Sequence, residues 1–172
     1  MTRPWFFSLP NRLACRLSVF LHFFHLQSTP YDVYLGGASN EYSSWRADIA
    51  IPIFDKLGVR YFDPRRNHWE ANHAFDELRA KSSSLIVMFV VDSKSRGLAT
   101  MIDAVEMIVA KEQRIVLVVE DVDPALNPTI DPKECKDLNR ARAYIADVAT
   151  RHGLLVYSSV VSSLRSQFSV CI

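Results

Sequence analysis

The run LIVMFVV at residues 85–91 contains no polar residue and predicts a strand at the centre of a sheet. An uninterrupted apolar run means that both faces of the strand are covered, as happens in the middle of a parallel sheet. A second such run, IVLVV at residues 115–119, predicts a neighbouring strand. Between the two runs, residues 98–112 carry apolar side chains at helical spacing. We assign the inward stripe of this predicted helix to Leu98, Met101, Ile102, Val105, Ile108 and Val109.

Shorter elements continue this alternation in both directions along the chain. Further strands are predicted at residues 32–35, 59–62 and 154–157, and further helices at 43–57, 73–81 and 138–151. A break is expected at Pro52 and a helix stop at Gly58. Strands that alternate with helices predict a parallel sheet with right-handed crossovers. We therefore predict an α/β fold of three layers, with a five-stranded, doubly wound parallel sheet of the flavodoxin-like kind, for which the strand order 2-1-3-4-5 is one that fits.

The beginning of the chain has a different composition. Residues 1–30 contain no Asp or Glu, and their formal charges come from Arg3, Arg12 and Arg16. This composition is typical of a mitochondrial transit peptide, and a poorly ordered extension is the alternative. The apolar stretch at residues 13–26 is too short and too interrupted for a stable membrane span. We expect an extension over residues 1–30, one domain over 31–160 and a tail over 161–172.

The overall composition excludes some functions and favours others. With 172 residues and a net charge of +1, the chain lacks the basic excess of a protein that binds a nucleic acid polymer. Its three cysteines are far apart and form neither a disulfide framework nor a CxxC metal pair. This favours an intracellular protein, cytoplasmic or mitochondrial, and no cofactor or metal is predicted. The pattern His68-x-Glu70-x-x-His73 matches no metal motif with a known mechanism.

Two loops are predicted to meet where ligands bind in such a sheet, beyond the carboxyl ends of the first and third strands. Gly36 and Gly37 follow the first strand and would let a ligand approach the backbone, and Ser39 could hold a phosphate or a sugar hydroxyl. A tight turn is the alternative. The second loop runs from Asp92 through Ser95 to Gly97 and leads into a helix, whose amino end favours an anion. An ordinary capped helix start would look the same.

Carboxylates on two predicted helices are the candidate acids and bases. Asp103 lies in the second turn of its helix within an apolar stretch, where an unpaired buried carboxylate would be costly. It must therefore reach the cleft or find a partner, unless it lies on a solvated face as Glu106 could. Asp76 and Glu77 lie about two turns before the third strand, and solvated helix carboxylates are the usual interpretation of such residues.

Several motifs occur in a fixed order along residues 31–157. They are VYLGGAS (33–39), WR (45–46), GVRYFDP (58–64), SLIVMFVVD (84–92), GLATMIDA (97–104), RIVLVV (114–119) and DLNRARAY (137–144). In this combination they resemble the nucleoside 2-deoxyribosyltransferase-like family. The resemblance implies cleavage or transfer at the N-glycosidic bond of a nucleoside or a nucleoside 5′-monophosphate. A carboxylate nucleophile forms a glycosyl-enzyme intermediate, which water or a second base resolves.

The resemblance also implies roles for individual residues. The nucleophile falls on Asp103, the assisting carboxylate on Asp76, and an aromatic that orients the nucleophile or lines the sugar site on Tyr34. The ligand-holding residues are Gly36, Gly37, Ser39 and Arg46, to which the loop analysis adds Asp92, Ser95 and Gly97. A homo-oligomer is implied as well. Because Asp103 stands where the family has Glu, the alternative is a catalytically impaired nucleotide-binding or regulatory module on the same fold.

Overall fold

The structure, a computed structural model, describes residues 29–38, 43–66, 68, 70, 72–111, 114–125 and 127–168. Residues 1–28 of the expected extension and the candidate Ser39 lie outside the described residues. The elements are β1 (Tyr31–Gly37), a π-helical turn η1 (Arg46–Ala50), α2 (Ile51–Leu57), β2 (Tyr61–Phe62), α3 (His73–Ser82), β3 (Ser84–Val91), α4 (Leu98–Ala110), β4 (Arg114–Val119), α5 (Pro132–Arg151), β5 (Val156–Tyr157) and α6 (Val160–Phe168). None of these helices has the length and apolar character to cross a bilayer.

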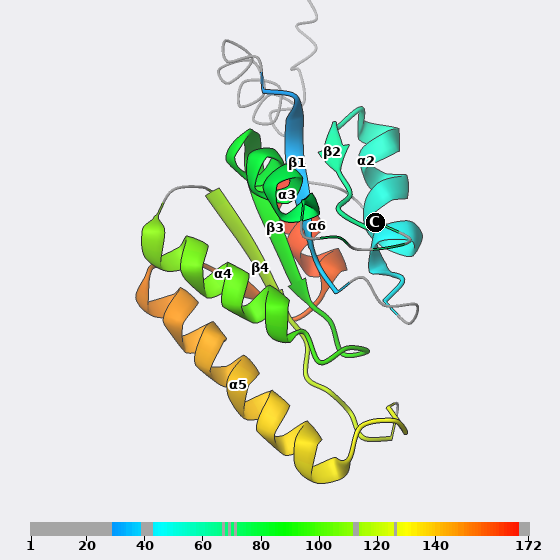
Figure 1. Cartoon of the computed structure of the whole chain (residues 1–172), viewed down its shortest axis with the longest axis vertical. Coiled ribbons are helices and arrows are strands. Elements are labelled where there is room, and N and C mark those ends of the chain that lie inside the picture. The colour runs from blue at the N-terminus through cyan, green and yellow to red at the C-terminus, as the bar shows by residue number, and fades with distance from the viewer. Residues whose placement is uncertain are drawn as a thin grey trace, which may run out of the picture.

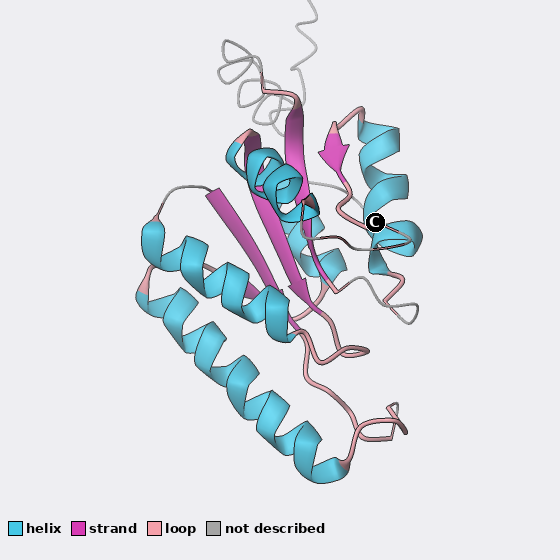
Figure 2. Cartoon of the chain, in the orientation of Figure 1, coloured by secondary structure: helices cyan, strands magenta, loops and turns pink. Residues whose placement is uncertain are grey.

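Five parallel strands form the sheet, in the order β2-β1-β3-β4-β5 (Figures 1 and 2). The predicted fold class is confirmed. β1 and β3 are neighbours from the pair Tyr31 and Ser84 to the pair Gly37 and Val90. The first crossover passes to β2 and the third to β4, so the chain leaves these two central strands in opposite directions. Their carboxyl ends therefore open a crevice, as the doubly wound topology requires.

Successive side chains along the strands pack alternately into two hydrophobic cores, one on each face of the sheet. Met88 and Val90 of β3 pack with η1, α2 and α6, whereas Val87, Phe89 and Val91 pack with α3, α4 and α5. Successive residues of a strand point to opposite faces, so one apolar run supplies both cores. The three layers thus follow directly from the lack of polar residues in β3.

The expected break at Pro52 is present, but the backbone changes just ahead of the proline. Residues Arg46–Ala50 wind as a π-helical turn, and regular α-helix begins at Ile51. Because proline has no N–H, it cannot donate to the preceding turn, and it fits best at the start of a helix. Gly58, with φ 67°, ends α2 in the left-handed conformation as predicted.

Two later segments differ from the sequence-based expectation. α5 begins at Pro132 instead of residue 138, because Asp131 accepts a hydrogen bond from the Lys133 N–H and proline stands at the first helical position. The expected tail is also folded, at least to Phe168. α6 packs on the sheet and contributes Val160 and Leu164 to the core, so residues 161–168 form part of the domain.

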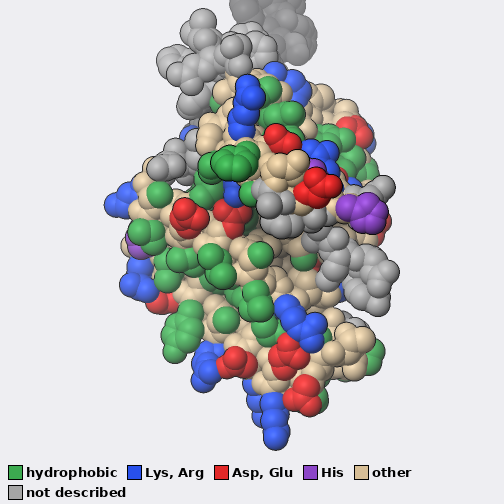
Figure 3. Space-filling view, viewed as in Figure 1, with side chains coloured by type: hydrophobic (Ala, Val, Ile, Leu, Met, Phe, Trp, Pro, Cys, Tyr) green, Lys and Arg blue, Asp and Glu red, His purple; other side chains and the backbone are tan. Residues whose placement is uncertain are grey.

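The inward stripe of α4 is only partly as predicted. Met101 and Ile108 are buried, but Leu98, Ile102 and Val109 are more than half exposed. Thr100 and Ala104 take the buried positions. The space-filling view shows apolar side chains gathered on this face of the molecule (Figure 3). The apolar surface of α4 is therefore wider than the sheet can cover.

Candidate functional site

Asp103 faces the neighbouring helix α3. Both carboxylate oxygens accept hydrogen bonds from the Lys81 Nζ, at 2.7 and 2.8 Å. The side chain of Lys81 is 12% exposed and that of Asp103 is 31% exposed. Asp103 thus has a partner, as a carboxylate in an apolar stretch must. It is nevertheless within reach of a solute, which a fully buried carboxylate would not be.

Tyr34 lies on the floor of the same region, in the middle of β1. Its side chain is buried, and the Lys81 Nζ lies 5.7 Å from its ring centroid. The phenol donates a long hydrogen bond, 3.4 Å, to Glu77 Oε2 of α3. Burial, reinforced by the charges of Glu77 and Asp103, raises the pKa of Tyr34 well above its usual value. The phenol therefore stays protonated and acts as a hydrogen-bond donor.

Tyr34, Glu77, Lys81 and Asp103 together form what we call the α3–α4 site. Sequence reasoning placed Tyr34 and Asp103 in one site, and Lys81 links them. It favoured Asp76 over Glu77, yet Asp76 is exposed, because adjacent helix residues point about 100° apart. Lys81 was not singled out. The i,i+4 spacing of Glu77 and Lys81 was the available signal, since it puts both on one helix face.

Packing accounts for the two glycines at the end of β1. A Cβ atom on Gly36 would lie 2.6 Å from the Phe89 ring. One on Gly37 would lie 2.9 Å from the Val90 carbonyl oxygen. Both residues belong to the strand itself and not to a free loop. A side chain at either position would push β1 away from its neighbours, so glycine is required here with or without a ligand.

Arg46 is fully buried and binds the backbone at the end of β1. Its guanidinium donates to the carbonyl oxygens of Leu35, Gly37 and Ala38, at 2.7–3.1 Å. Burial lowers the pKa of Arg46 to about 10, so the side chain stays charged at neutral pH. The predicted ligand-holding residue therefore orders the strand end, and its donors are engaged by backbone.

Arg142 of α5 likewise binds backbone carbonyl oxygens, in the loops after β3 and β4. Its Nε donates to Glu120 O at 2.9 Å, and its Nη2 donates to Asp92 O at 3.0 Å and Ser95 O at 2.7 Å. The Ser95 side chain is buried, and its Oγ has no hydrogen-bond partner among the described residues. The loop then reaches α4 through Gly97, which has φ 66°. Sequence reasoning missed Arg142, because arginine is seldom buried.

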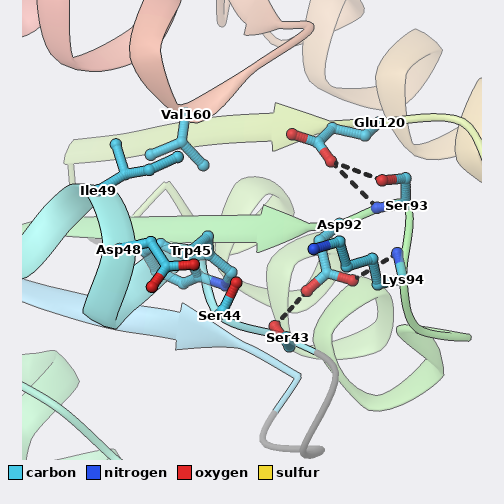
Figure 4. Close-up of a pocket in the computed structure, with 10 residues that line it drawn as sticks. All are labelled: Ser43, Ser44, Trp45, Asp48, Ile49, Asp92, Ser93, Lys94, Glu120 and Val160. Carbon is cyan, nitrogen blue, oxygen red and sulfur yellow. Dashed lines mark hydrogen bonds between the residues drawn. The ribbon is translucent and has the colours of Figure 1, made fainter.

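Asp92 points to the other face of the sheet. Ser43 Oγ donates to its Oδ2, and the Lys94 backbone N–H donates to its Oδ1 at 3.0 Å. It lines a cavity that also contacts Trp45 and Glu120 (Figure 4). Asp92 and Asp103 therefore do not share a cleft, although both were predicted to line one site.

His73 is the first residue of α3, and His68 precedes the helix. His73 Nδ1 accepts a hydrogen bond from the Glu70 N–H at 3.0 Å, and His68 is exposed. Within the described ranges, the His, Cys, Asp and Glu side chains form no group of three placed to hold a metal ion. The hydrogen bond between Glu70 and His73 is one that stabilises the start of α3.

Comparison with known proteins adds one informative match. A family model described as nucleoside 2-deoxyribosyltransferase like matches residues 30–122, from just before β1 to just beyond β4. No curated protein matches the chain. Among solved structures, the TIR domains of the activated Roq1 resistosome that directly recognizes the pathogen effector XopQ align with a TM-score of 0.44 and 17% identity. That alignment covers 81% of this chain and 98% of the other. The family match includes every residue of the α3–α4 site.

Proposed function

The chain belongs to the nucleoside 2-deoxyribosyltransferase-like family, and we propose that it cleaves or transfers at the N-glycosidic bond of a nucleoside or nucleoside 5′-monophosphate. One observation carries this proposal. Asp103, the nucleophile that the family resemblance implies, shares the partner Lys81 with Tyr34, the aromatic side chain to which the resemblance gives an orienting role. A second carboxylate, Glu77, contacts the same aromatic side chain. Glycosidic chemistry of the retaining kind needs two carboxylates with different tasks.

In the proposed reaction Asp103 is the nucleophile. One Oδ attacks C1′ of the sugar, the C1′–N bond breaks, and the base leaves with a proton supplied by a second carboxyl group. The resulting glycosyl ester is opened by water in a hydrolase, or by another base in a transferase. Lys81 holds both Oδ atoms in the free protein, so substrate has to draw one of them away from the ammonium group.

The second carboxyl group is proposed to be Glu77. It is partly buried and accepts the hydrogen bond of Tyr34, whereas Asp76 is exposed on the next face of α3. Tyr34 then orients Glu77 instead of reacting itself, because its phenol stays protonated. Asp76, the position that the family resemblance implies, is the matched alternative on the same helix.

The experiment is a search for free base. Purified protein is incubated with a panel of nucleosides and 5′-monophosphates, and released bases are separated by chromatography. Asp103→Asn keeps the shape of the side chain and is expected to lower turnover by at least about a thousandfold. Glu77→Gln is expected to lower it strongly, and Asp76→Asn only slightly. Release of no base from any compound would refute the proposed activity.

A second candidate is a nucleotide-binding or regulatory module without turnover. The observation that favours it is the engagement of both Asp103 oxygens by Lys81. Asp103 is also one methylene shorter than the family's Glu, and a displacement of about 1 Å can slow a reaction about a hundredfold. Calorimetric titration with nucleoside monophosphates separates the two candidates. Binding without base release supports the module.

Self-association is part of the family proposal. Phe75 of α3 and Ile102 of α4, on helices that carry the α3–α4 site, are 77% and 71% exposed. A second copy of the chain is the proposed occupant of this surface, since exposed large apolar side chains often mark interfaces. Light scattering should give a mass above that of one chain, and Ile102→Glu should reduce it. A monomer at all concentrations would contradict this.

The cellular location, cytoplasmic or mitochondrial, stays a prediction. It rests on the composition of residues 1–30, which lack acidic side chains. Fusion of residues 1–30 to a fluorescent reporter tests it directly. Mitochondrial fluorescence that is lost when Arg3, Arg12 and Arg16 are changed to Glu would support a targeting role. A diffuse signal would support the extension instead.

A further inference from the structure

A row of exposed apolar side chains extends over α3 and α4, and we call it the apolar strip. Its members, each more than half exposed, are Phe75 and Leu78 of α3 and Leu98, Ile102 and Val109 of α4. The ion pair of Lys81 with Asp103 joins the last turn of α3 to the second turn of α4, so the two parts of the strip adjoin. Figure 3 shows apolar side chains over both helices, with acidic ones among them. Such an exposed apolar surface is typical of a binding site for another polypeptide segment.

The charges beside the apolar strip are unbalanced. α4 carries the carboxylates of Asp103 and Glu106 and no Lys or Arg, whereas α3 carries two acidic residues, one Arg and one Lys. Glu106 is exposed and lies one turn from both Ile102 and Val109. A segment that matches the strip is therefore both apolar and positively charged. A second copy of the chain matches only the apolar part, because it brings the same carboxylates, which repel each other.

Residues 1–28 of the same chain have both properties. They contain no Asp or Glu, and Arg3, Arg12 and Arg16 are their formal charges. Their aromatic side chains are Trp5, Phe6, Phe7, Phe20, Phe23 and Phe24. Burial of such side chains against the strip removes apolar surface of both partners from water, and the arginines supply the charge that α4 lacks.

The point at which residues 1–28 join the fold lies close to the apolar strip. The first residue of β1, Tyr31, pairs with Ser84, and α3 ends just before that residue, at Ser82. Tyr31 also packs on the core that α3, α4 and α5 cover. α4 has 13 residues and is about 20 Å long, whereas residues 1–28 can span about 90 Å when extended. The segment is therefore long enough to reach every residue of the strip in its own chain.

We propose that residues 1–28 bind along the apolar strip of their own chain, with their arginines beside the carboxylates of α4. Because the segment is covalently attached, its effective concentration at the strip is on the order of millimolar, and weak contacts are enough to hold it. While attached, it competes with a second copy of the chain for the same surface. The competition rests on the proposed self-association, whereas the binding of residues 1–28 depends neither on self-association nor on turnover.

Photo-cross-linking of the full chain tests the binding. Ile102→p-benzoylphenylalanine places a light-activated group on the strip, and Leu57→p-benzoylphenylalanine places the same group on α2, which packs on the other face of the sheet. A dilute mixture of isotope-labelled and unlabelled chains is irradiated, so that mass spectrometry separates cross-links within one chain from those between two. Position 102 should cross-link to residues 1–28 of the same chain at least about tenfold more often than position 57, since tethering alone brings the segment to both. Equal yields, no cross-link to residues 1–28, or cross-links only between two chains would overturn the proposal.

Charge variants of the segment test the ionic part. Arg3→Glu, Arg12→Glu and Arg16→Glu, made together, should lower the cross-linking yield from position 102 about tenfold, because attraction to the carboxylates of α4 becomes repulsion. Lysine at the same three positions keeps the charge and should keep the yield. An unchanged yield in the glutamate variant would refute the charge complementarity on which the choice of this segment depends.

Light scattering of the glutamate variant tests the competition with a second copy. The variant should associate at about tenfold lower protein concentration than the original chain, since residues 1–28 occupy fewer of the strips. Association of both proteins at the same concentration would contradict the competition. If neither protein associates, the proposed self-association is wrong, and the cross-linking yields still decide whether residues 1–28 bind the strip.

Discussion

Two aspartates, Asp103 on α4 and Asp92 after β3, flank the same loop but are held in opposite ways. A charged, flexible side chain, Lys81, binds both oxygens of Asp103, which is about a third exposed. A hydroxyl and a backbone N–H bind Asp92, which is 5% exposed. An ion pair near solvent exchanges partners at little cost, whereas a buried hydrogen-bonded carboxylate does not. Asp103, the nucleophile of the proposed reaction, can therefore change partners, whereas Asp92 holds the end of β3 in place.

The largest effect is expected on the Asp92 side, at Arg142. Arg142→Met removes the donor to three carbonyl oxygens, of which two lie in the loop after β3 that begins at Asp92 and one in the loop after β4, and it should lower the free energy of unfolding by about 3 kcal/mol. Arg140→Met is the matched control on the same helix. Its side chain is exposed and pairs with Asp137, so a change within about 0.5 kcal/mol is expected. Urea denaturation of both variants measures the difference, and equal losses would contradict the assigned role of Arg142.

The comparison of the two aspartates can be tested by removing each in turn. Asp92→Ala leaves the Ser43 hydroxyl and the Lys94 N–H without an acceptor, and it should lower the free energy of unfolding by about 2 kcal/mol. Asp103→Ala should lower it by less than about 1 kcal/mol, because its ion pair is partly solvated. Thermal or urea unfolding reports both values. If Asp103→Ala proves the more destabilising, the comparison is wrong.

Substitution of Lys81 tests whether its ion pair positions Asp103, the proposed nucleophile, for reaction. Lys81→Met keeps the length of the side chain but releases Asp103, and kcat for the substrate found in the base-release panel should fall about tenfold, or roughly 1.4 kcal/mol. Lys111→Met, at the exposed end of α4, is the control and should leave kcat unchanged. A rise in kcat would mean that Lys81 blocks Asp103 instead of positioning it.

The smallest effect concerns the pH dependence at Tyr34. Burial raises the pKa of Tyr34 above the value of about 10 that it has in the unfolded chain, so the folded state holds its proton longer. The associated stability is fully present below pH 10 and declines as the pH rises further. Tyr34→Phe should reduce that decline, with a change of under about 1 kcal/mol at pH 8. Urea denaturation at pH 8 and pH 10.5 measures it, and the exposed Tyr144→Phe should behave like the original protein.

The fold was predictable because its strongest signals are apolar runs. The segments 85–91 and 115–119 cannot be solvated, so the central strands and the covered faces follow from them. The first residues of helices that begin in polar sequence were harder to predict. The first turns of α5 carry little apolar periodicity, yet Asp131 and Pro132 were an available start signal. The segment of α6 was assigned to a tail because its sequence is rich in serine, which weakens the apolar pattern of Val160, Leu164 and Phe168.

The candidate site was predictable only in part, because the sequence does not show the direction in which each side chain points. Tyr34 and Asp103 were predicted from their motifs, and both contact Lys81, but motifs do not say which way a side chain points. Asp76 and Glu77 differ by one residue and thus by the helix face they occupy. Asp92 and Gly97 share a loop, although Asp92 points across the sheet. Arg142 binds backbone carbonyls that lie 22 to 50 residues away along the chain, which local sequence cannot reveal. Arg46 binds carbonyls only 8 to 11 residues away, but the motif does not show that they, and not a ligand, are its partners.

The position of α6 has a consequence for the order in which the protein can be made. β4 is synthesised well before α6, and the apolar side chains Val116 and Val118 on one face of it are covered in part by Leu164. During translation that face stays open until α6 has emerged from the ribosome. Chains that stop near residue 160 would therefore expose apolar side chains on one face of the sheet, and they would be candidates for aggregation or chaperone capture. Synthesis of α6 therefore completes the cover of this face of the sheet.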